Sequence, residues 1–279
     1  MTTHRHKVIP ADARALIEAR IGKITEYENA EGGLNSEIAA HVHTRHGSIF
    51  VKGLRRDHRR IWTQRREADI APYVEGIAPA LLWRLKGAGW DLNAFENVEG
   101  RHADYAPGSA DLPLVVELLV NLSQVEAPDV ELRSMADRMQ HHTTTSDWFA
   151  GDALLHTDWF PANVLVKSDG TARLVDWAWA STGAPWIDPA LWVVWLIKAG
   201  HSPEEAEEWA RQVPAFNEAD GVAVDAFAEA TVSVWEEITA NDSAPWTKEM
   251  LNAARAWVAS RSQPPIFPDI YAPGERDNG

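Results

Sequence analysis

The stretch His156-Thr157-Asp158-Trp159-Phe160-Pro161-Ala162-Asn163, followed by Leu174-Val175-Asp176-Trp177, decides the fold of this chain. It places an aspartate, an asparagine five positions later, and a second aspartate after a short turn. Asp158 can orient a hydroxyl group and accept its proton. Asn163 and Asp176 offer oxygen atoms, which are the ligands that Mg²⁺ takes. The pattern is typical of a site that moves a phosphoryl group from a nucleotide held by magnesium.

A predicted hairpin explains why these residues can meet. The apolar segments 164–166 and 173–175 are predicted to be strands, and the turn between them contains Asp-Gly, a strong hairpin signal. A hairpin brings its outer ends together, so Asn163 and Asp176 can reach one ion, with Asp158 on the loop just upstream. The alternative is three unrelated polar residues of loops. A lone H-x-D…N pattern would favour that interpretation, whereas the hairpin and the second aspartate favour a site.

The segment resembles the catalytic core of the aminoglycoside phosphotransferase family, a branch of the protein-kinase-like fold. That family commonly shows H-G-D-x-x-x-x-N, an apolar strand pair, I-D-W/F and a helix start like D-P-x-x-D-L-A. Four parts of this chain match: His156-Thr157-Asp158, Asn163, Val175-Asp176-Trp177 and Trp186-Ile187-Asp188-Pro189-Ala190. The chain departs at Thr157, where the family has glycine, and at Ala178, where glutamate is frequent. Neither departure removes the proposed base or a proposed metal ligand.

The resemblance implies an α+β, bilobal protein-kinase-like fold. We expect a small N-terminal antiparallel-sheet lobe that binds nucleotide, residues 1–98, and a larger, mostly helical lobe for catalysis and substrate binding, residues 99–279. The predicted elements follow that order. They are a helix at 11–20, strands at 23–29, 37–44 and 48–54, a helix at 61–73, strands at 80–85 and 90–98, and helices at 112–125, 132–142 and 186–199.

Lys52 lies within an apolar predicted strand, where a lysine is costly to bury without a partner. Glu67 follows fifteen positions later in the next predicted helix. The resemblance implies an ion pair between the two that holds Lys52 against the α- and β-phosphates of a nucleotide. An outward-facing lysine is the alternative, and Glu67 could instead pair at the surface with Arg65 or Arg66.

The remaining nucleotide contacts are expected from main-chain groups. The turn between the first two predicted strands contains a Gly-Gly pair, and we expect Gly33 and Ser36 to lie over the phosphates. There is no full G-x-G-x-x-G, so an ordinary hairpin turn is the alternative. In the connection between the lobes, the resemblance implies that Glu96 and Val98 hydrogen-bond adenine. Phe95 would line the adenine pocket or simply pack in the core.

Other polar and aromatic residues near the motif favour structural roles. Asp188 is expected at a helix start, accepting hydrogen bonds from the free N–H groups there. His156 is expected to hold the catalytic loop through a buried hydrogen bond. Five of the fourteen tryptophans lie close to the motif in sequence. We expect them to pack in the core, and stacking on a sugar or aromatic substrate is the alternative. The five are Trp148, Trp159, Trp177, Trp179 and Trp186.

Composition limits the classes of protein. A chain of 279 residues can form two lobes with sizeable cores. The absence of cysteine excludes disulfides and thiolate metal sites. Residues 1–10 lack the apolar core of a signal peptide, and the apolar run 190–197 is too short to span a membrane, which takes about twenty residues. We therefore expect a soluble, cytoplasmic protein with no membrane partner; the sequence is silent on its oligomeric state.

The formal net charge of −15 is uneven, because residues 201–279 contain fifteen acidic and five basic side chains. An acidic surface repels nucleic acid and attracts cations, so we expect no nucleic-acid partner despite the seven basic residues of 55–66. The acidity suits a polycationic substrate such as an aminoglycoside. Ordinary solvated helix faces, as at 204–208, are the alternative.

Together these features predict an ATP-dependent O-phosphotransferase, with GTP possible, that uses Mg²⁺ and phosphorylates a hydroxyl of a small molecule. The resemblance points to an aminoglycoside-like antibiotic or a related cationic metabolite, and so to antibiotic resistance. One alternative is a kinase for peptide or protein Ser/Thr hydroxyls, although the twelve positions from Asp176 to Asp188 leave little room for an activation segment. The other is a silent nucleotide-binding protein, against which intact Lys52, Asp158 and Asp176 argue.

Overall fold

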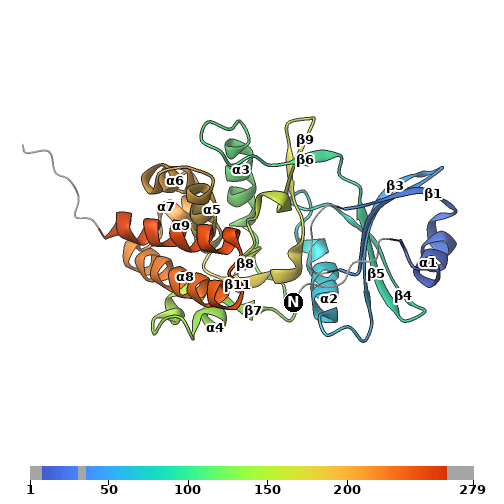
Figure 1. Ribbon diagram of the computed structural model, residues 1–279, viewed down its shortest axis with the longest axis horizontal. Helices are drawn as coiled ribbons and strands as arrows, with labels where there is room; N and C mark the ends of the chain where they lie inside the picture. Colours follow the sequence, from blue (N-terminus) through green and yellow to red (C-terminus); the bar gives the residue numbers. More distant parts are fainter. Residues whose placement is uncertain (1–7, 31–35, 263–279) are drawn as a thin grey trace, which may run out of the picture.

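A five-stranded antiparallel sheet of order β1-β2-β3-β5-β4 forms the N-terminal lobe in the computed structural model, which describes residues 8–30 and 36–262. Its strands are β1 (Ile24–Asn29), β2 (Ile38–Thr44), β3 (Gly47–Arg55), β4 (Leu81–Gly87) and β5 (Trp90–Glu96). Figure 1 shows this lobe on the right and a mostly helical lobe on the left. The protein therefore has the α+β, bilobal architecture that the sequence predicts.

The two faces of this sheet have different neighbours. Ala40, Val51 and Ala94 are paired across three strands and share one core with Ile17 of α1 (Ala11–Ile21). Side chains alternate between faces along a strand, so Lys52 lies on the opposite face. There α2 (Ile61–Ile70) contacts β3 and β5, between the sheet and the helical lobe (Figure 1). The register therefore turns Lys52 toward the rest of the molecule.

One large apolar core holds the C-terminal lobe, with Trp192 and Trp257 among its fully buried side chains. Its helices are α3 (Leu112–Leu122), α4 (Met135–Met139), α5 (Ile187–Lys198), α6 (Pro203–Ala210), α7 (Pro214–Asn217), α8 (Gly221–Asn241) and α9 (Pro245–Arg261). The short 3₁₀ helices of this lobe are η2 (Ser146–Phe149), η3 (Pro161–Asn163) and η4 (Trp177–Trp179), whereas η1 (Ala71–Tyr73) follows α2 in the N-terminal lobe. Within the described ranges, none of the helices has the length and apolarity that a membrane span requires.

Two small sheets carry the loops of the predicted site. The first has the order β10-β9-β6 and contains the predicted hairpin, and the second has the order β7-β11-β8. Their strands are β6 (Gly100–His102), β9 (Val164–Lys167), β10 (Ala172–Leu174), β7 (Arg133–Ser134), β8 (Ala153–Leu155) and β11 (Ser181–Gly183). A Cβ atom at Gly100 would lie 2.7 Å from the Val166 carbonyl oxygen, so only glycine lets β6 pair this closely with β9.

Several predicted elements have other bounds in the structure; the helix expected at 112–125 ends at Leu122, and the strand expected at 80–85 is Leu81–Gly87. The helix expected at 132–142 is reduced to α4, because Arg133 and Ser134 pair with β11 and the Ser134 hydroxyl caps the helix start by accepting the Asp137 N–H. The strand expected at 90–98 ends at Glu96, where the chain leaves the five-stranded sheet. The helix expected at 61–73 continues beyond Ile70 only as the 3₁₀ turn η1.

The chain crosses once from the five-stranded sheet to the sheets of the helical lobe, between β5 and β6. Residues 97–99 form this crossing and belong to neither sheet. We therefore propose a boundary at 98/99, with residues 1–98 as the N-terminal lobe and 99–279 as the C-terminal lobe.

Candidate active site

Lys52, Glu67 and Asp176 meet where the two lobes touch. The Lys52 ammonium lies 2.6 Å from Glu67 Oε1 and 3.1 Å from Asp176 Oδ1, and all three side chains are largely buried. Each comes from a different part of the fold: Lys52 from β3, Glu67 from α2, and Asp176 from the second residue after the β9–β10 hairpin. The structure thus forms the lysine–glutamate pair and adds a second carboxylate to it. The pairing of Glu67 with Arg65 or Arg66 is not the one seen.

Burial and charge act against each other in this cluster. Burial alone would lower the pKa of Lys52, but the carboxylates of Asp176 and Glu67 raise it above its ordinary value. Burial raises the pKa of Glu67 against the pull of Lys52. Although burial also acts on Asp176, Lys52 holds the pKa of that carboxyl below its ordinary value. Lys52 is therefore a fixed cation beside an ionised Asp176.

Asp158 and Asn163 lie on the loop before β9, and their local geometry ties them together. The Asn163 Nδ2 group donates to the Asp158 carbonyl oxygen at 3.0 Å. The Asn163 carbonyl accepts the Val175 N–H at 2.8 Å, which joins this loop to the residue before Asp176. Since Nδ2 donates to the protein, the amide oxygen is the Asn163 atom left for a metal ion. Burial, and then the Asp176 carboxylate, raise the pKa of Asp158 to about 6.

His156 holds the same loop, as the sequence predicts. Its Nδ1 accepts the Asp158 N–H at 3.3 Å, which leaves the proton on Nε2 to donate to the Val175 carbonyl at 3.0 Å. The ring is completely buried, with an edge contact to Trp177 at 4.8 Å between centroids. Burial lowers its pKa to about 4, so the imidazole is neutral near pH 7.

Asp188 has a structural position, but its partners differ from those expected. It lies at the second residue of α5, and its carboxylate accepts the N–H groups of His156 at 2.8 Å and Thr157 at 2.9 Å. The expected bonds to the N–H groups of its own helix are wrong, because the side chain turns toward the loop 156–163 instead. Burial raises the pKa of Asp188 to about 6, against the pull of these donors.

Sequence reasoning missed Arg138 of α4. Its guanidinium donates to the Thr157 hydroxyl at 2.7 Å and to the Ser181 hydroxyl at 2.8 Å, so it joins the loop 156–163 to β11. Nothing in the polar, mixed sequence of 132–142 distinguished this arginine from an exposed one. The one available signal was at Thr157, where a β-branched residue replaces the family's glycine.

The other predicted nucleotide contacts are partly placed. Gly33 lies outside the described residues, and Ser36 is buried just before β2. The Glu96 N–H donates to the Ala80 carbonyl at 2.8 Å, so a contact from Glu96 to a base would have to use its own carbonyl group. Val98 is half-buried on the crossing between the lobes. These roles stay predictions.

Three of the five tryptophans near the motif pack in the core, whereas most acidic side chains of 204–208 face solvent. Trp159, Trp177 and Trp186 are buried, whereas Trp148 and Trp179 are partly exposed. In α6, the capping box with Ser202 uses Glu205, and Glu207 is buried against Trp257 Nε1 at 2.7 Å. Glu204, Glu205 and Glu208 are exposed, so this helix start is mainly a solvated acidic face, of whose glutamates only Glu207 is buried.

The side-chain oxygen atoms near Lys52 can be compared with the ligands that a magnesium ion requires. In the described part of the chain, no group of three or more His, Cys, Asp or Glu side chains is placed to hold a metal by itself. Asp176 and Asn163 supply one carboxylate and one amide oxygen. That set fits Mg²⁺, which is commonly held by one or two carboxylates together with the phosphates of a bound nucleotide.

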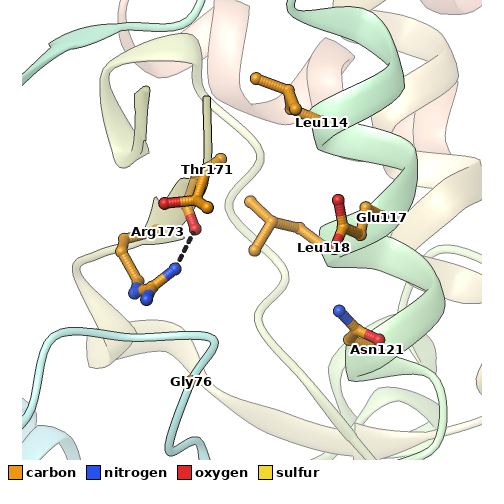
Figure 2. Close-up of a pocket in the computed structure, with 8 residues that line it drawn as sticks. Gly76, Leu114, Glu117, Leu118, Asn121, Thr171 and Arg173 are labelled. Carbon is orange, nitrogen blue, oxygen red and sulfur yellow. Dashed lines mark hydrogen bonds between the residues drawn. The ribbon is translucent and has the colours of Figure 1, made fainter. Parts of the chain in front are cut away.

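Figure 2 shows a separate small cavity between α3 and the β9–β10 hairpin. Glu117 and Asn121 of α3 face Thr171 and Arg173 across it, and Arg173 donates to the Ala172 carbonyl at 2.9 Å. Its volume of about 70 Å³ holds water molecules but not a nucleotide. None of its lining residues belongs to the cluster around Lys52.

No protein-family model and no curated protein matches this sequence. Solved structures do match. Choline kinase LicA from Streptococcus pneumoniae is 15% identical, with a TM-score of 0.62 over 88% of this chain and 98% of that one. An aminoglycoside phosphotransferase from Alicyclobacillus acidocaldarius is 13% identical, with a TM-score of 0.63 over 92% and 96%. This chain has the fold of these small-molecule kinases.

A third structure with this kinase fold is a thermostable mutant of aminoglycoside phosphotransferase APH(4)-Ia, in ternary complex with AMP-PNP and hygromycin B. It is 13% identical, with a TM-score of 0.59 over 87% of this chain and 98% of that one. LicA has also been crystallised with AMP. Because these likenesses span both lobes, the expected bilobal small-molecule kinase fold is confirmed. The ligands belong to those proteins.

Proposed function

We propose that this chain is a phosphotransferase that moves the γ-phosphoryl group of a magnesium-bound nucleotide to a hydroxyl of a small molecule. One observation carries the proposal. Lys52 is fixed between Glu67 and Asp176, at 2.6 and 3.1 Å, beside a loop that presents Asp158 and Asn163. A buried cation, an acidic metal ligand and a separate carboxylate are the groups that phosphoryl transfer requires.

In this proposal each side chain has one task. Asp158 accepts a hydrogen bond from the acceptor hydroxyl and takes its proton as the oxygen attacks the γ-phosphorus. A pKa of about 6 leaves Asp158 ionised at neutral pH yet basic enough to take the proton. Lys52 balances negative charge on the α- and β-phosphates as the bond to the leaving group loosens. Asn163 and Asp176 would hold Mg²⁺, which neutralises phosphate charge.

The expected nucleotide is ATP, with GTP as the alternative. Glu96 and Val98 would meet the base, and Gly33 and Ser36 would lie near the phosphates. The bound AMP-PNP of one structural neighbour and the AMP of another support nucleotide binding at this fold. A shift in melting temperature with ATP or GTP, each with Mg²⁺, distinguishes the two nucleotides. We also place this activity in the cytoplasm, where nucleoside triphosphates are available.

For the acceptor we propose an aminoglycoside-like or related cationic small molecule, and therefore a role in antibiotic resistance. Support comes from the net charge of −15 and from the hygromycin B bound by one neighbour. A choline-like acceptor belongs to the same class, since another neighbour is a choline kinase. A polycation and a compact quaternary ammonium compound share the positive charge that an acidic lobe attracts.

A peptide hydroxyl is the second candidate, and the structure offers it less support. Between Asp176 and Asp188 the chain forms η4 and the short strand β11, and Ser181 within it is only 1% exposed. A buried serine in a sheet cannot serve as an activation-segment phosphorylation site. The candidate therefore rests on the acidic charge alone.

The test is transfer of labelled phosphate from γ-labelled ATP or GTP to panels of aminoglycosides, choline-like amines and Ser/Thr peptides, read by mass spectrometry. The proposal predicts the gain of one phosphate on a small-molecule hydroxyl, dependent on Mg²⁺ and abolished in Asp158→Asn. If only the peptides were labelled, the proposed small-molecule acceptor would be wrong and a peptide hydroxyl would take its place. A protein that binds nucleotide but labels nothing in any panel would be a silent nucleotide-binding protein.

A further inference from the structure

Thr157 has an unusual backbone conformation next to Asp158. Its φ of 65° lies in the left-handed region, which β-branched residues rarely adopt. Such a conformation persists only where surrounding contacts over-determine it. The position belongs to glycine in the family motif, for which this conformation has no steric cost. Something in this chain must therefore hold Thr157 in place.

Three contacts from three segments do so. The Thr157 hydroxyl donates to the Trp179 carbonyl at 2.8 Å and accepts from the Arg138 guanidinium at 2.7 Å. Its N–H donates to Asp188 Oδ1 at 2.9 Å. A glycine could keep only the last of these. The threonine side chain thus links the Asp158 loop to α4 and to the segment that follows Asp176.

Arg138 completes the link from the other side. The same guanidinium nitrogen also donates to the Trp179 carbonyl at 3.2 Å and to the Ser181 hydroxyl at 2.8 Å. These three acceptors, two hydroxyls and one carbonyl, are all neutral. The half-buried guanidinium therefore holds neighbouring segments in position and does not form an ion pair with them. Burial, and then repulsion from Arg133 and Arg66, lower the pKa of Arg138 to about 10, which still leaves it charged at neutral pH.

The segment that Arg138 holds is also fixed to the N-terminal lobe. Trp179 makes an edge contact with Trp62 of α2 at 5.4 Å between ring centroids. Arg66 of α2 donates to the Ala178 carbonyl at 3.4 Å. The Ala178–Ser181 segment therefore lies between α2, which carries Glu67, and the Arg138–Thr157 pair, which lies beside Asp158.

We propose that Arg138 and Thr157 act together as positioning residues that fix the Asp158 loop relative to the segment after Asp176 for phosphoryl transfer. This inference rests on the proposed function and adds to it a device specific to this chain. Neither side chain need touch the nucleotide or the acceptor. A small displacement of the base relative to the phosphate costs rate, because transfer requires the reacting groups in contact and aligned.

The experiment compares the full-length chain with Arg138→Met, Thr157→Val and the double variant, using hydrogen–deuterium exchange of peptides covering 154–160 and steady-state transfer kinetics. Arg133→Met is the matched control, since Arg133 is exposed and its recorded side-chain bond is to the Asp137 carbonyl. Thr157→Ser is the rescue variant, because it keeps the hydroxyl and loses the β-branch. Melting temperatures check that each variant is folded.

We expect Arg138→Met and Thr157→Val to speed exchange in 154–160 about tenfold, as loss of a hydrogen bond to a charged group would. The kcat should fall between about tenfold and a hundredfold, while the KM for nucleotide changes less than about twofold. Because both changes break the same contact, the double variant should be no worse than the more impaired single variant. Thr157→Ser and Arg133→Met should behave as the unaltered chain.

Exchange in 154–160 that is unchanged by Thr157→Val overturns the proposal, as do additive losses in the double variant. If Arg138→Met does not fold, the Thr157→Val and Thr157→Ser pair still decides it. Faster exchange in the variants, with no transfer by the unaltered chain to any acceptor, would sustain the positioning of the loop and overturn the proposed function. If exchange in 154–160 becomes faster in the variants but their kcat equals that of the Arg133→Met control, the loop position does not govern phosphoryl transfer, and the proposal is overturned.

Discussion

Lys52 and Asp176 form an ion pair at 3.1 Å although 124 positions separate them in the chain. The pair joins the sheet of the N-terminal lobe to the hairpin end of the C-terminal lobe. Asp176 adopts φ 65° and ψ 66°, so its backbone turns immediately after the strand and presents the carboxylate to Lys52. The relative placement of the two lobes is thus coupled to the groups that would hold nucleotide.

Replacing Lys52 by methionine should destabilise the protein and abolish transfer. Glu67 and Asp176 would remain buried without their cation, and breaking a buried ion pair in this way costs about 3 kcal/mol. Without Lys52 the folded-state pKa values of both carboxyls would lie above their unfolded values. Folded protein would then take up protons more readily, so the loss of stability should be larger at pH 8 than at pH 5.

Thermal unfolding of Lys52→Met and of the unaltered chain at both pH values measures this difference. Lys86→Met is a matched control, since Lys86 is a half-exposed lysine of the same sheet. A penalty in Lys52→Met that is the same at both pH values would mean that the two carboxyls do not depend on Lys52.

Asp158→Asn should leave nucleotide binding intact and remove transfer. The asparagine keeps the shape of the side chain but cannot take a proton, and loss of a general base costs about 10²- to 10⁴-fold in rate. Isothermal titration with AMP-PNP and Mg²⁺ measures nucleotide affinity, and a single-turnover assay measures the rate of phosphoryl transfer. Asp169→Asn, on the exposed hairpin turn, is the control. Equal losses of binding and rate in Asp158→Asn would assign the residue to metal or nucleotide binding instead.

His156 should make stability depend on pH. Its folded-state pKa of about 4 lies below the ordinary value of 6.5, so the unfolded chain binds the proton more readily between these values. The stabilising contribution is fully present above about pH 6.5 and is lost as pH falls toward 4, amounting to about 3 kcal/mol. Denaturant unfolding of His156→Gln over this range should give a flatter profile. His46→Gln, at an exposed histidine, should keep the steep one.

Patterns local in sequence predicted the hairpin and the ion pair that bring the side chains of the candidate site together. The Asp-Gly turn and its apolar flanks gave the β9–β10 hairpin, and the hairpin geometry placed Asn163 and Asp176 at its two ends. The family resemblance implied that Lys52 and Glu67 pair, the cost of burying an unpaired lysine favoured it, and they do so at 2.6 Å. Each of these inferences needed only one element or two adjacent ones.

Features that depend on distant segments were not predictable. The parallel pairing of Arg133 with Ser181 shortens the expected helix at 132–142, and no local pattern indicates it. Asp188 was expected to cap its own helix, but its carboxylate accepts the N–H groups of His156 and Thr157 instead. The role of Arg138 depends likewise on acceptors that tertiary structure brings together.

The most direct measurement of the central claim is calorimetric titration of AMP-PNP into the unaltered chain and Asp176→Asn, each with and without Mg²⁺. We predict that the unaltered chain binds AMP-PNP and that Mg²⁺ strengthens this binding. The gain in affinity from Mg²⁺ should be at least about tenfold smaller in Asp176→Asn, because a proposed metal ligand has lost its charge. No nucleotide binding by the unaltered chain, or the same gain in both proteins, would contradict it.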